Sequence, residues 1–150
     1  MTKEKKEFKV SVVIPTYNRV AYLGRAINSV LKQSYPINEI IVIDNGSTDQ
    51  TLSFIKKKFN SIRVIIEKKR GVSFARNLGI KNCKYNWIAF LDSDDEWITD
   101  KIEKQFILLK KSNFKYQFIH TNEIWIKNGT LKNQKKKHLK KGGHIFEDCL

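Results

Sequence analysis

The sequence predicts an α/β fold, in which helices cover both faces of a doubly wound, mostly parallel sheet. Short β-branched runs alternate with amphipathic helical patterns along most of the chain. The runs are apolar almost throughout, which is typical of parallel strands that are buried on both faces. With 150 residues, 41% of them hydrophobic, the chain is long enough to form one domain with a single core.

The expected strands of the sheet are short, and they lie at residues 10–14, 40–43, 62–66 and 87–91. Pro15 is expected to interrupt the first strand. Asn18 is expected to cap the helix that follows, and Tyr35-Pro36 ends it. The apolar face of this helix repeats at helical spacing and consists of Leu23, Ala26, Ile27, Val30 and Leu31.

Two more helices are expected between the later strands. Ser47 or Thr48 caps the first of them, and Gly71 opens the second, which runs to about residue 81. The side chains expected to face the sheet are Leu52, Ile55 and Phe59 in the first helix, and Phe74, Ala75 and Leu78 in the second.

The pattern changes after residue 95. A helix is expected over residues 99–111, and two strands are expected at 116–120 and 123–126. The inward side chains of the helix are Ile102, Phe106 and Leu109. Asn128-Gly129 is a hairpin turn signal, so the C-terminal part is expected to contain a β-hairpin.

The chain is strongly basic, with a net charge of +14. This indicates an anionic partner, or else only a soluble, lysine-rich surface. Residues 127–141 contain seven lysines and no acid, which is typical of a solvated loop, or alternatively of peripheral attachment to an anionic membrane. Without a membrane-spanning run, a signal-peptide pattern or a cysteine framework, we expect a cytoplasmic protein, with any attachment at the inner face of the membrane.

Polar segments directly follow three of the expected strands. These segments are Pro15-Thr16-Tyr17-Asn18, Asp44-Asn45-Gly46 and Asp92-Ser93-Asp94. The carboxyl ends of parallel strands share one edge of a sheet, and ligands bind beyond that edge. We therefore expect these distant segments to form one site.

The side chains at this edge suit a nucleoside diphosphate that is held through a metal. Asp92 and Asp94 offer oxygen ligands to a divalent cation, which relieves their mutual repulsion. Asp44 can accept a hydrogen bond from an imide N–H, as in uracil. Tyr17 offers a ring face for a base, and Arg76 is a natural phosphate partner. The sequence contains neither a P-loop nor a GxGxxG motif, which removes the main support for other nucleotide folds.

Each of these residues also has a plain structural interpretation, which stays open at this point. Asp44 can cap its own turn, Tyr17 can be a packing aromatic, and Arg76 can be a surface residue of its helix. The acidic run at 92–95 can be a solvated turn. Asp49 is expected to complement a helix dipole and to bind no ligand.

The strings VSVVIPTYNR, VIDNGSTDQT, GVSFARNLGI and FLDSDDEW resemble, in this order and spacing, the signatures of the family 2 glycosyltransferases, which have the GT-A fold. The resemblance covers residues 8–97 and implies a Rossmann-like domain that binds a nucleotide sugar. Members transfer the sugar, often from a UDP-linked donor, to a hydroxyl acceptor, usually with inversion. Many of them build surface polysaccharides or glycolipids.

The resemblance also implies roles for single residues. Those placed at the nucleotide sugar are Pro15, Thr16, Tyr17, Asp44, Arg76, Asp92 and Ser93. The first three would lie against the nucleobase, which Asp44 contacts, and Arg76 would support the nucleotide. Asp92-Ser93-Asp94 would be the DxD motif, in which Asp94 and Asp92 hold Mn²⁺ or Mg²⁺ and Asp94 is the principal ligand.

The sequence departs from the family pattern in two places. Many members have two acids where this chain has Asp44-Asn45. The family's general base is an acid some way past the DxD motif, and none of the acids after Glu103 lies in a matching motif. Those acids are Glu123, Glu147 and Asp148. We assign no catalytic residue, and expect a single domain over residues 1–150 that is truncated before its base.

The expected function is thus metal-dependent transfer from a nucleotide sugar to a carbohydrate or lipid-linked acceptor. One alternative is an inactive fragment that binds the nucleotide sugar but lacks the base. The other is a basic nucleic-acid-binding protein, which only the net charge supports. Because the sequence has no RRM, helix-turn-helix or zinc-finger signature, we expect no nucleic-acid partner.

Overall fold

The computed structural model describes residues 8–133 and residue 140. They belong to two compact units, Met1–Lys111 and Ser112–Leu150, each of which is described by itself. The expectation of a single domain over residues 1–150 stays a prediction. Within the described part of the chain, no helix is long and apolar enough to cross a membrane.

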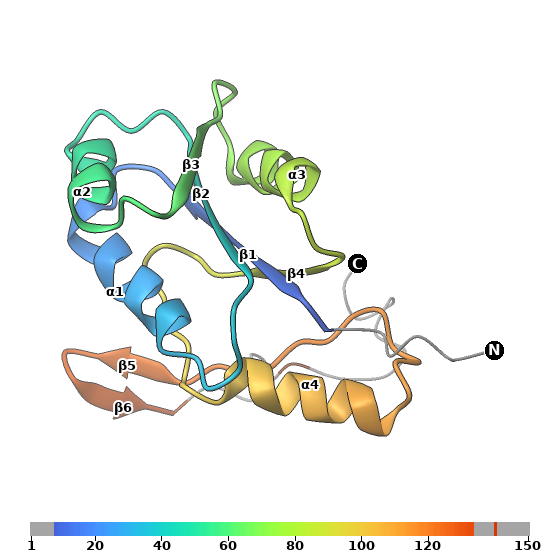
Figure 1. Cartoon of the computed structure of the whole chain (residues 1–150). Coiled ribbons are helices and arrows are strands. Elements are labelled where there is room, and N and C mark those ends of the chain that lie inside the picture. Colours follow the sequence, from blue (N-terminus) through green and yellow to red (C-terminus); the bar gives the residue numbers. More distant parts are fainter. Residues whose placement is uncertain (1–7, 134–139, 141–150) are drawn as a thin grey trace. The chain divides into compact units, whose positions relative to one another are not determined.

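The first unit is built on a parallel sheet with helices on both faces, which confirms the predicted fold class (Figure 1). Its strands are β1 (Val10–Thr16), β2 (Glu39–Asp44), β3 (Arg63–Ile66) and β4 (Trp87–Phe90). Their order across the sheet is β3-β2-β1-β4, so the chain begins in the middle and winds outward in both directions. Because every pairing is parallel, all four carboxyl ends lie at one edge.

Pro15 does not interrupt β1, so this prediction is wrong. The strand continues to Thr16, and Pro15 stands in register with Ile43 of β2. A missing N–H is tolerated here because the strand ends one residue later. Pairing with β2 even continues past the end, since the Asn45 N–H donates to the Thr16 carbonyl oxygen at 2.8 Å.

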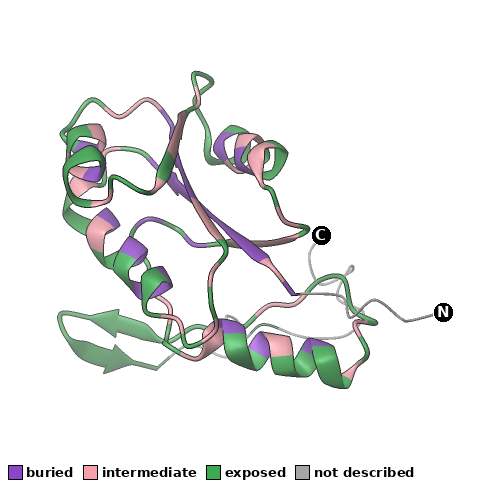
Figure 2. Cartoon of the chain, viewed as in Figure 1, coloured by how far each residue is buried: buried purple, intermediate pink, exposed green. Residues whose placement is uncertain are grey.

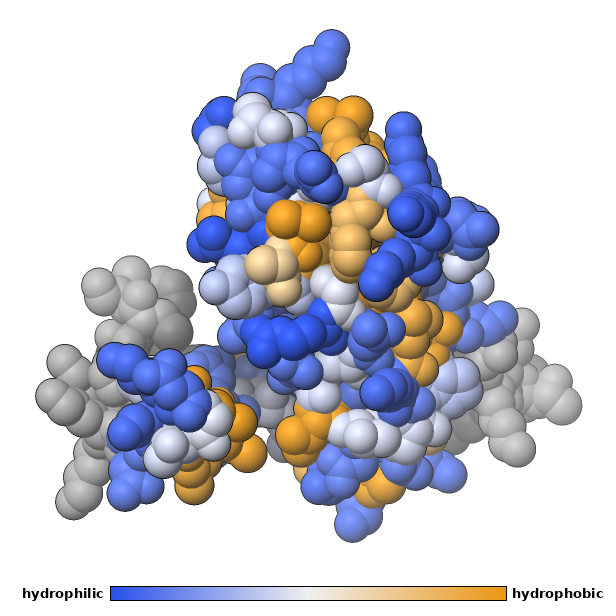
Figure 3. All heavy atoms as spheres, turned by 90° about the vertical axis from the view of Figure 1, so that its left-hand side faces the viewer, coloured by the Kyte–Doolittle hydropathy of each residue, from blue (hydrophilic) through white to orange (hydrophobic). Residues whose placement is uncertain are grey.

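Helices α1 (Val20–Leu31) and α2 (Thr51–Lys58) lie on one face of the sheet, and α3 (Val72–Asn82) lies on the other (Figure 1). The core lies between these layers, where β1 is buried along its whole length (Figure 2). The predicted apolar face of α1 is buried except for Leu31, which is 56% exposed at the end of the helix. Hydrophilic residues predominate on the face of the molecule where α1 and α2 lie, and patches of hydrophobic side chains are exposed among these hydrophilic residues (Figure 3).

Small residues bring α3 close to the sheet. Ala75 and Gly79 are the buried residues of this helix, and Phe74, which was predicted to face inward, is 46% exposed. A Cβ atom added to Gly79 would lie 2.4 Å from Cγ1 of Val13 in β1. The helix therefore packs more tightly than an inward phenylalanine would permit, which explains the wrong prediction for Phe74.

The N-termini of α1 and α2 are not capped by the expected side chains. The residues at the N-cap positions are Arg19 and Gln50, and neither makes a side-chain capping hydrogen bond. Instead, Asp49 accepts hydrogen bonds from the N–H groups of Thr51 at 2.9 Å and Val20 at 3.4 Å, which agrees with its expected place at a helix N-terminus. The Thr51 hydroxyl also donates to Asp49, and these bonds lower the pKa of its carboxyl below the ordinary value of 3.8.

Asn18 connects two loops instead of capping a helix. Its backbone lies in the left-handed region with φ 50°. Its Oδ1 atom accepts hydrogen bonds from the N–H groups of Thr48 at 2.8 Å and Asp49 at 3.3 Å. The loop after β1 is thereby tied to the loop after β2.

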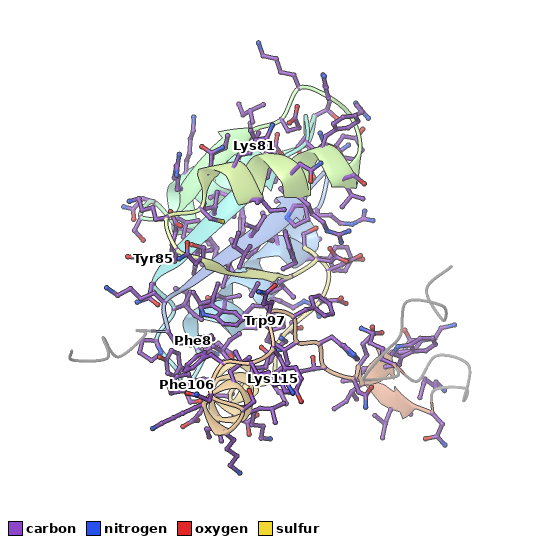
Figure 4. All side chains as sticks on the ribbon, turned by 90° about the vertical axis from the view of Figure 1, so that its right-hand side faces the viewer. Phe8, Lys81, Tyr85, Trp97, Phe106 and Lys115 are labelled. Carbon is purple, nitrogen blue, oxygen red and sulfur yellow. The ribbon has the colours of Figure 1, made fainter. Side chains whose placement is uncertain are left out.

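Helix α4 (Lys101–Lys111) begins two residues later than predicted. Gln33 fixes its start, because the Gln33 Oε1 atom accepts from the Ile102 N–H at 3.0 Å and its Nε2 atom donates to the Ile98 carbonyl oxygen at 2.8 Å. Phe106 packs on Phe8, with ring centroids 5.0 Å apart (Figure 4). The predicted inward residues Ile102 and Leu109 are buried.

The second unit contains the predicted hairpin, formed by β5 (Trp125–Lys127) and β6 (Thr130–Lys132). Asn128-Gly129 forms its turn, with φ 51° and 72°. The strand expected at 116–120 is absent, and β5 begins later than the strand expected at 123–126. Residues of the missing strand such as Phe118, which is 74% exposed, have no partner strand to pair with in the described part of this unit.

Candidate functional site

A cavity of about 440 Å³ lies at the carboxyl ends of the strands. Its lining comes from the last residues of β1, from the segments that follow all four strands, and from the first turns of α3. The lining residues are Pro15, Thr16, Tyr17, Arg19, Asn45, Arg70, Gly71, Val72, Ala75, Arg76, Asp92, Ser93 and Asp94. The structure thus brings the predicted site residues together at one edge, and Asp44 alone among them lies outside the lining.

Asp44 is buried at the last position of β2, paired in register with Thr16 of β1. Its Oδ2 atom accepts a hydrogen bond from the Ser47 N–H at 3.0 Å, so it does stabilise its own turn. Its Oδ1 atom and the Thr16 hydroxyl are buried without a hydrogen-bond partner. An unsatisfied buried polar group is unfavourable by about 1–3 kcal/mol. A ligand that supplies an N–H to Asp44 would therefore be stabilised here.

Arg76 and Asp92 form an ion pair between α3 and the loop after β4. The Arg76 Nη2 atom donates to Asp92 Oδ1 at 2.6 Å, and the two side chains are 38% and 48% exposed. The Nε atom of Arg76 is buried without a partner. Arg76 is therefore directed at the acidic loop, unlike an ordinary surface residue of its helix, and it keeps one donor unused.

Arginines of α1 and its N-cap contact the same acidic loop. Asp94 Oδ2 lies 3.8 Å from Nε of Arg19, with both side chains about half exposed. Glu96 Oε1 lies 3.6 Å from Nη1 of Arg25. Ser93 is buried. The loop is thus held between α1 and α3, and its carboxylates already face positive charges.

The carboxylates of Asp92 and Asp94 fit one kind of metal site. Among residues 8–133 and 140, no group of three or more His, Cys, Asp or Glu side chains is placed to hold a metal ion. Mg²⁺ is commonly bound by one or two carboxylates, with substrate phosphates and water as the other ligands. Two oxygen donors beside a cavity suit this arrangement, in which the ligand completes the coordination.

The sequence did not single out Arg19 or Arg70, and it placed Asn45 at the site only as part of the segment Asp44-Asn45-Gly46. The guanidinium carbon of Arg70 lies 4.4 Å from the centroid of the Tyr17 ring, and Nη1 donates to the Tyr17 hydroxyl at 2.6 Å. Tyr17 is 39% exposed beside the cavity, so it is not a core aromatic. Asn45 is bonded to the loop that carries Arg70. A signal for this loop existed, because β3 ends at the same edge as the other strands.

Comparison with known proteins finds glycosyltransferases both by family model and by single relatives. The family model described as Glycosyl transferase family 2 matches residues 11–146. An uncharacterized glycosyltransferase of Rickettsia felis is 49% identical over 116 residues, which are 76% of this chain and 19% of that protein. The UDP-Glc:alpha-D-GlcNAc-diphosphoundecaprenol beta-1,3-glucosyltransferase WfgD of Escherichia coli is 36% identical over 126 residues, which are 79% of this chain and 49% of that protein.

Solved structures agree with this assignment. The crystal structure of S. aureus TarS in complex with UDP has a TM-score of 0.64 and 30% sequence identity, over 71% of this chain and 33% of that chain. The expected GT-A architecture is therefore confirmed. The chain spans about half the length of WfgD and less of the other two proteins. By the match to its family model and by these relatives, the chain belongs to family 2 of the glycosyltransferases.

Proposed function

We propose that the cavity is the donor site of a glycosyltransferase that takes its sugar from a UDP-linked donor. The observation that carries this proposal is the buried Oδ1 atom of Asp44, which has no hydrogen-bond partner and lies directly behind the lining, since Asp44 is paired with Thr16 and precedes Asn45, both of which line the cavity. The N3–H of uracil is a donor of the required kind. The Thr16 hydroxyl lies nearby, because Thr16 of β1 is paired in register with Asp44 of β2. WfgD, whose name specifies UDP-glucose, and TarS, crystallised with UDP, support this choice of base.

We assign the nucleobase to the part of the cavity that is lined by Pro15, Thr16 and Tyr17, and the diphosphate to the part that is lined by Asp92, Ser93 and Asp94. Asp94 and Asp92 would hold Mn²⁺ or Mg²⁺, which when bound neutralises charge on the leaving diphosphate. Arg76 orients Asp92 through their ion pair, and its unused Nε–H is a donor for phosphate oxygen.

The acceptor and the general base are not assigned to described residues. Inversion requires a base that reaches the acceptor hydroxyl. Glu123 pairs with Lys140 and accepts from Trp125 Nε1 in the second unit, so its carboxylate already has partners. Glu147 and Asp148 lie outside the described residues, so no general base is assigned. We therefore propose binding of the donor from assigned residues, whereas the residue needed for turnover, the general base, is unassigned.

We assign the acceptor to carbohydrate or lipid-linked chains in polysaccharide or glycolipid synthesis, because the name of WfgD specifies a sugar on a lipid diphosphate, alpha-D-GlcNAc-diphosphoundecaprenol, as its acceptor. Peripheral attachment to an anionic membrane at the cytoplasmic face is part of the same proposal. The start of the lysine-rich segment, which includes Lys127 and Lys132, is exposed in the hairpin. The remaining lysines that this idea relies on lie mostly outside the described residues.

Calorimetric titration of UDP with and without Mn²⁺ tests the donor site. Asp44→Asn keeps the size of the side chain but replaces one acceptor by a donor, and we expect UDP affinity to fall at least tenfold, as when a buried polar partner is mismatched. Asp94→Ala should abolish the effect of Mn²⁺ on the affinity. Asp100→Asn, which changes a partly exposed carboxylate paired with Lys104 away from the cavity lining, is the matched control.

The outcomes separate the alternatives. Unchanged UDP affinity in Asp44→Asn would refute the assignment of Asp44 to the nucleobase. Mn²⁺-independent binding in the wild type would remove the metal role of Asp94 and Asp92. Incubation of UDP-glucose with a lipid-linked acceptor then distinguishes an active transferase from an inactive donor-binding chain.

A further inference from the structure

We infer that Asn45 is a positioning residue of the donor site, which acts by holding Arg70 against Tyr17 on the base side of the cavity. The inference rests on the proposed function for the identity of the ligand. The anchoring of the loop at residues 67–71 stands on its own contacts. It gives a role to the position where the sequence has an amide in place of the acid found in many family members.

The side chain of Asn45 is bonded at both ends to backbone groups of this loop. Its Nδ2 atom donates to the carbonyl oxygens of Lys69 at 2.7 Å and Glu67 at 3.2 Å. Its Oδ1 atom accepts from the Gly71 N–H at 2.8 Å. Asn45 is 7% exposed, so water cannot easily replace these bonds. Both amide hydrogens and the amide oxygen are therefore in use.

Only an amide satisfies this arrangement. An ionised carboxylate has acceptors but no donor, so it would direct a charged oxygen at two carbonyl oxygens. That contact is repulsive in a buried position. The choice of asparagine in place of aspartate therefore follows from the path of the loop.

The loop needs such an anchor. Lys68, Lys69 and Arg70 are three consecutive cations, which repel one another. Gly71 has φ 131°, a conformation that side-chain-bearing residues rarely adopt, and it turns the chain into α3. The loop joins β3 to α3 at the top of Figure 1. Held from within by Asn45, it places Arg70 next to Tyr17 by a sharp and well-defined turn.

Arg70 and Tyr17 then form one surface of the cavity. The guanidinium covers the tyrosine ring at 4.4 Å from the centroid and donates to the hydroxyl at 2.6 Å. Both residues line the cavity, next to Thr16 and Asn45. Arginine has five N–H donors, so it keeps donors for an oxygen of the base or ribose after its bond to Tyr17. The pair thus belongs to recognition of the nucleoside and not of the diphosphate.

The test compares UDP with inorganic pyrophosphate, which lacks the nucleoside. In the presence of Mn²⁺, Asn45→Asp and Arg70→Ala should each weaken UDP binding about tenfold, the loss of one stacking or charge-assisted contact, and leave pyrophosphate binding within about twofold. Asn82→Asp is the matched control, because it also removes an amide donor to a backbone carbonyl, that of Leu78 at 2.9 Å, at the far end of α3. Equal losses for both ligands would overturn the inference.

A double-mutant cycle tests whether Asn45 acts through Arg70. If it does, the variant with both substitutions should bind UDP about as weakly as either single variant, because the second change has nothing left to disturb. A roughly hundredfold combined loss would mean that the two residues act independently and would refute the positioning role. Arg70→Ala alters an exposed loop residue, so it tests the base-side contact even if Asn45→Asp folds poorly.

The pH dependence gives a signature that a general loss of structure would not produce. In Asn45→Asp the introduced carboxyl regains one donor when it is protonated, and burial beside carbonyl oxygens raises its pKa. The ratio of variant to wild-type UDP dissociation constants should therefore fall as the pH decreases from 8 to 5. A constant ratio over this range would contradict the hydrogen-bond assignment.

Trypsin supplies a readout that needs no ligand, since it cleaves after Lys68, Lys69 and Arg70. Asn45→Asp should accelerate cleavage at these bonds about tenfold relative to wild type and to Asn82→Asp, as expected when an anchor of about 1.4 kcal/mol is lost and cleavage follows the open population. Unchanged cleavage would show that Asn45 does not hold the loop. If cleavage accelerates but the wild type binds no UDP, the proposed function and the role in base recognition fail together, and the anchor alone remains.

Discussion

The close approach of α3 to β1 predicts that Gly79→Ala destabilises the protein, although alanine is the better helix former. The added Cβ would lie 2.4 Å and 3.0 Å from the two Cγ atoms of Val13, which is fully buried in the central strand β1. Helix propensity favours alanine by about 1 kcal/mol. Overpacking costs about 1–3 kcal/mol, and an overlap of about 1 Å against a favourable C–C separation of about 3.5 Å calls for the upper end. The net expected loss is about 2 kcal/mol.

Urea unfolding followed by circular dichroism measures this loss. With a slope of about 2 kcal/mol per molar urea, the midpoint should fall by about 1 M. Asn77→Ala is the matched control, because Asn77 lies in the same helix but is exposed, and its midpoint should stay unchanged or rise slightly. A Gly79→Ala midpoint at or above that of the wild type would show that α3 moves away from the sheet at no energetic penalty, and the reasoning would be refuted.

Three further predictions follow from contacts outside the cavity. The hydrogen bonds from Thr51 lower the pKa of Asp49, so the stability that this carboxylate contributes is present above about pH 4 and is lost as the pH falls through the lowered pKa. The melting temperature of Asp49→Asn should therefore depend less on pH between about 5 and 2 than that of the wild type. Burial raises the pKa of the Cys83 thiol, so its alkylation by iodoacetamide at pH 8 should be slower than that of free cysteine when followed by mass spectrometry. Gln33→Ala leaves the Ile102 N–H without its acceptor, and should lower the free energy of unfolding by about 1 kcal/mol and speed hydrogen exchange in the first turn of α4; exchange as slow as in the wild type would show that another group caps the helix.

The layout of the fold and the edge that carries the site could be predicted from the sequence, because both depend on local patterns. Apolar runs mark the strands of a parallel sheet, and that sheet alone places Thr16, Asp44 and Asp92 at one edge. Periodicity also found the buried face of α1. It failed at Leu31, where the helix ends, because a repeating pattern does not indicate where its last turn lies.

Contacts between distant segments could not be predicted in the same way. Asn18 matched a helix cap in the sequence, but the loop after β2 offers it two backbone N–H groups in space. Phe74 fits the periodic pattern of the inner face of α3. In the structure, the small residues Ala75 and Gly79 set the distance between this helix and the sheet. The strand expected at 116–120 had a suitable composition, whereas a strand also needs a neighbour, which composition does not reveal.

The carboxylate of Asp49 has a consequence for how the molecule opens. It accepts from the first helical residues of both α1 and α2, so fraying of either helix releases a partner of the other. Two ends that would otherwise open separately are thereby joined into one local unfolding unit. The loops that lead from Tyr17 and Asp44 belong to the same unit. We therefore expect the helix ends and the nucleobase side of the cavity to open together, at a single rate.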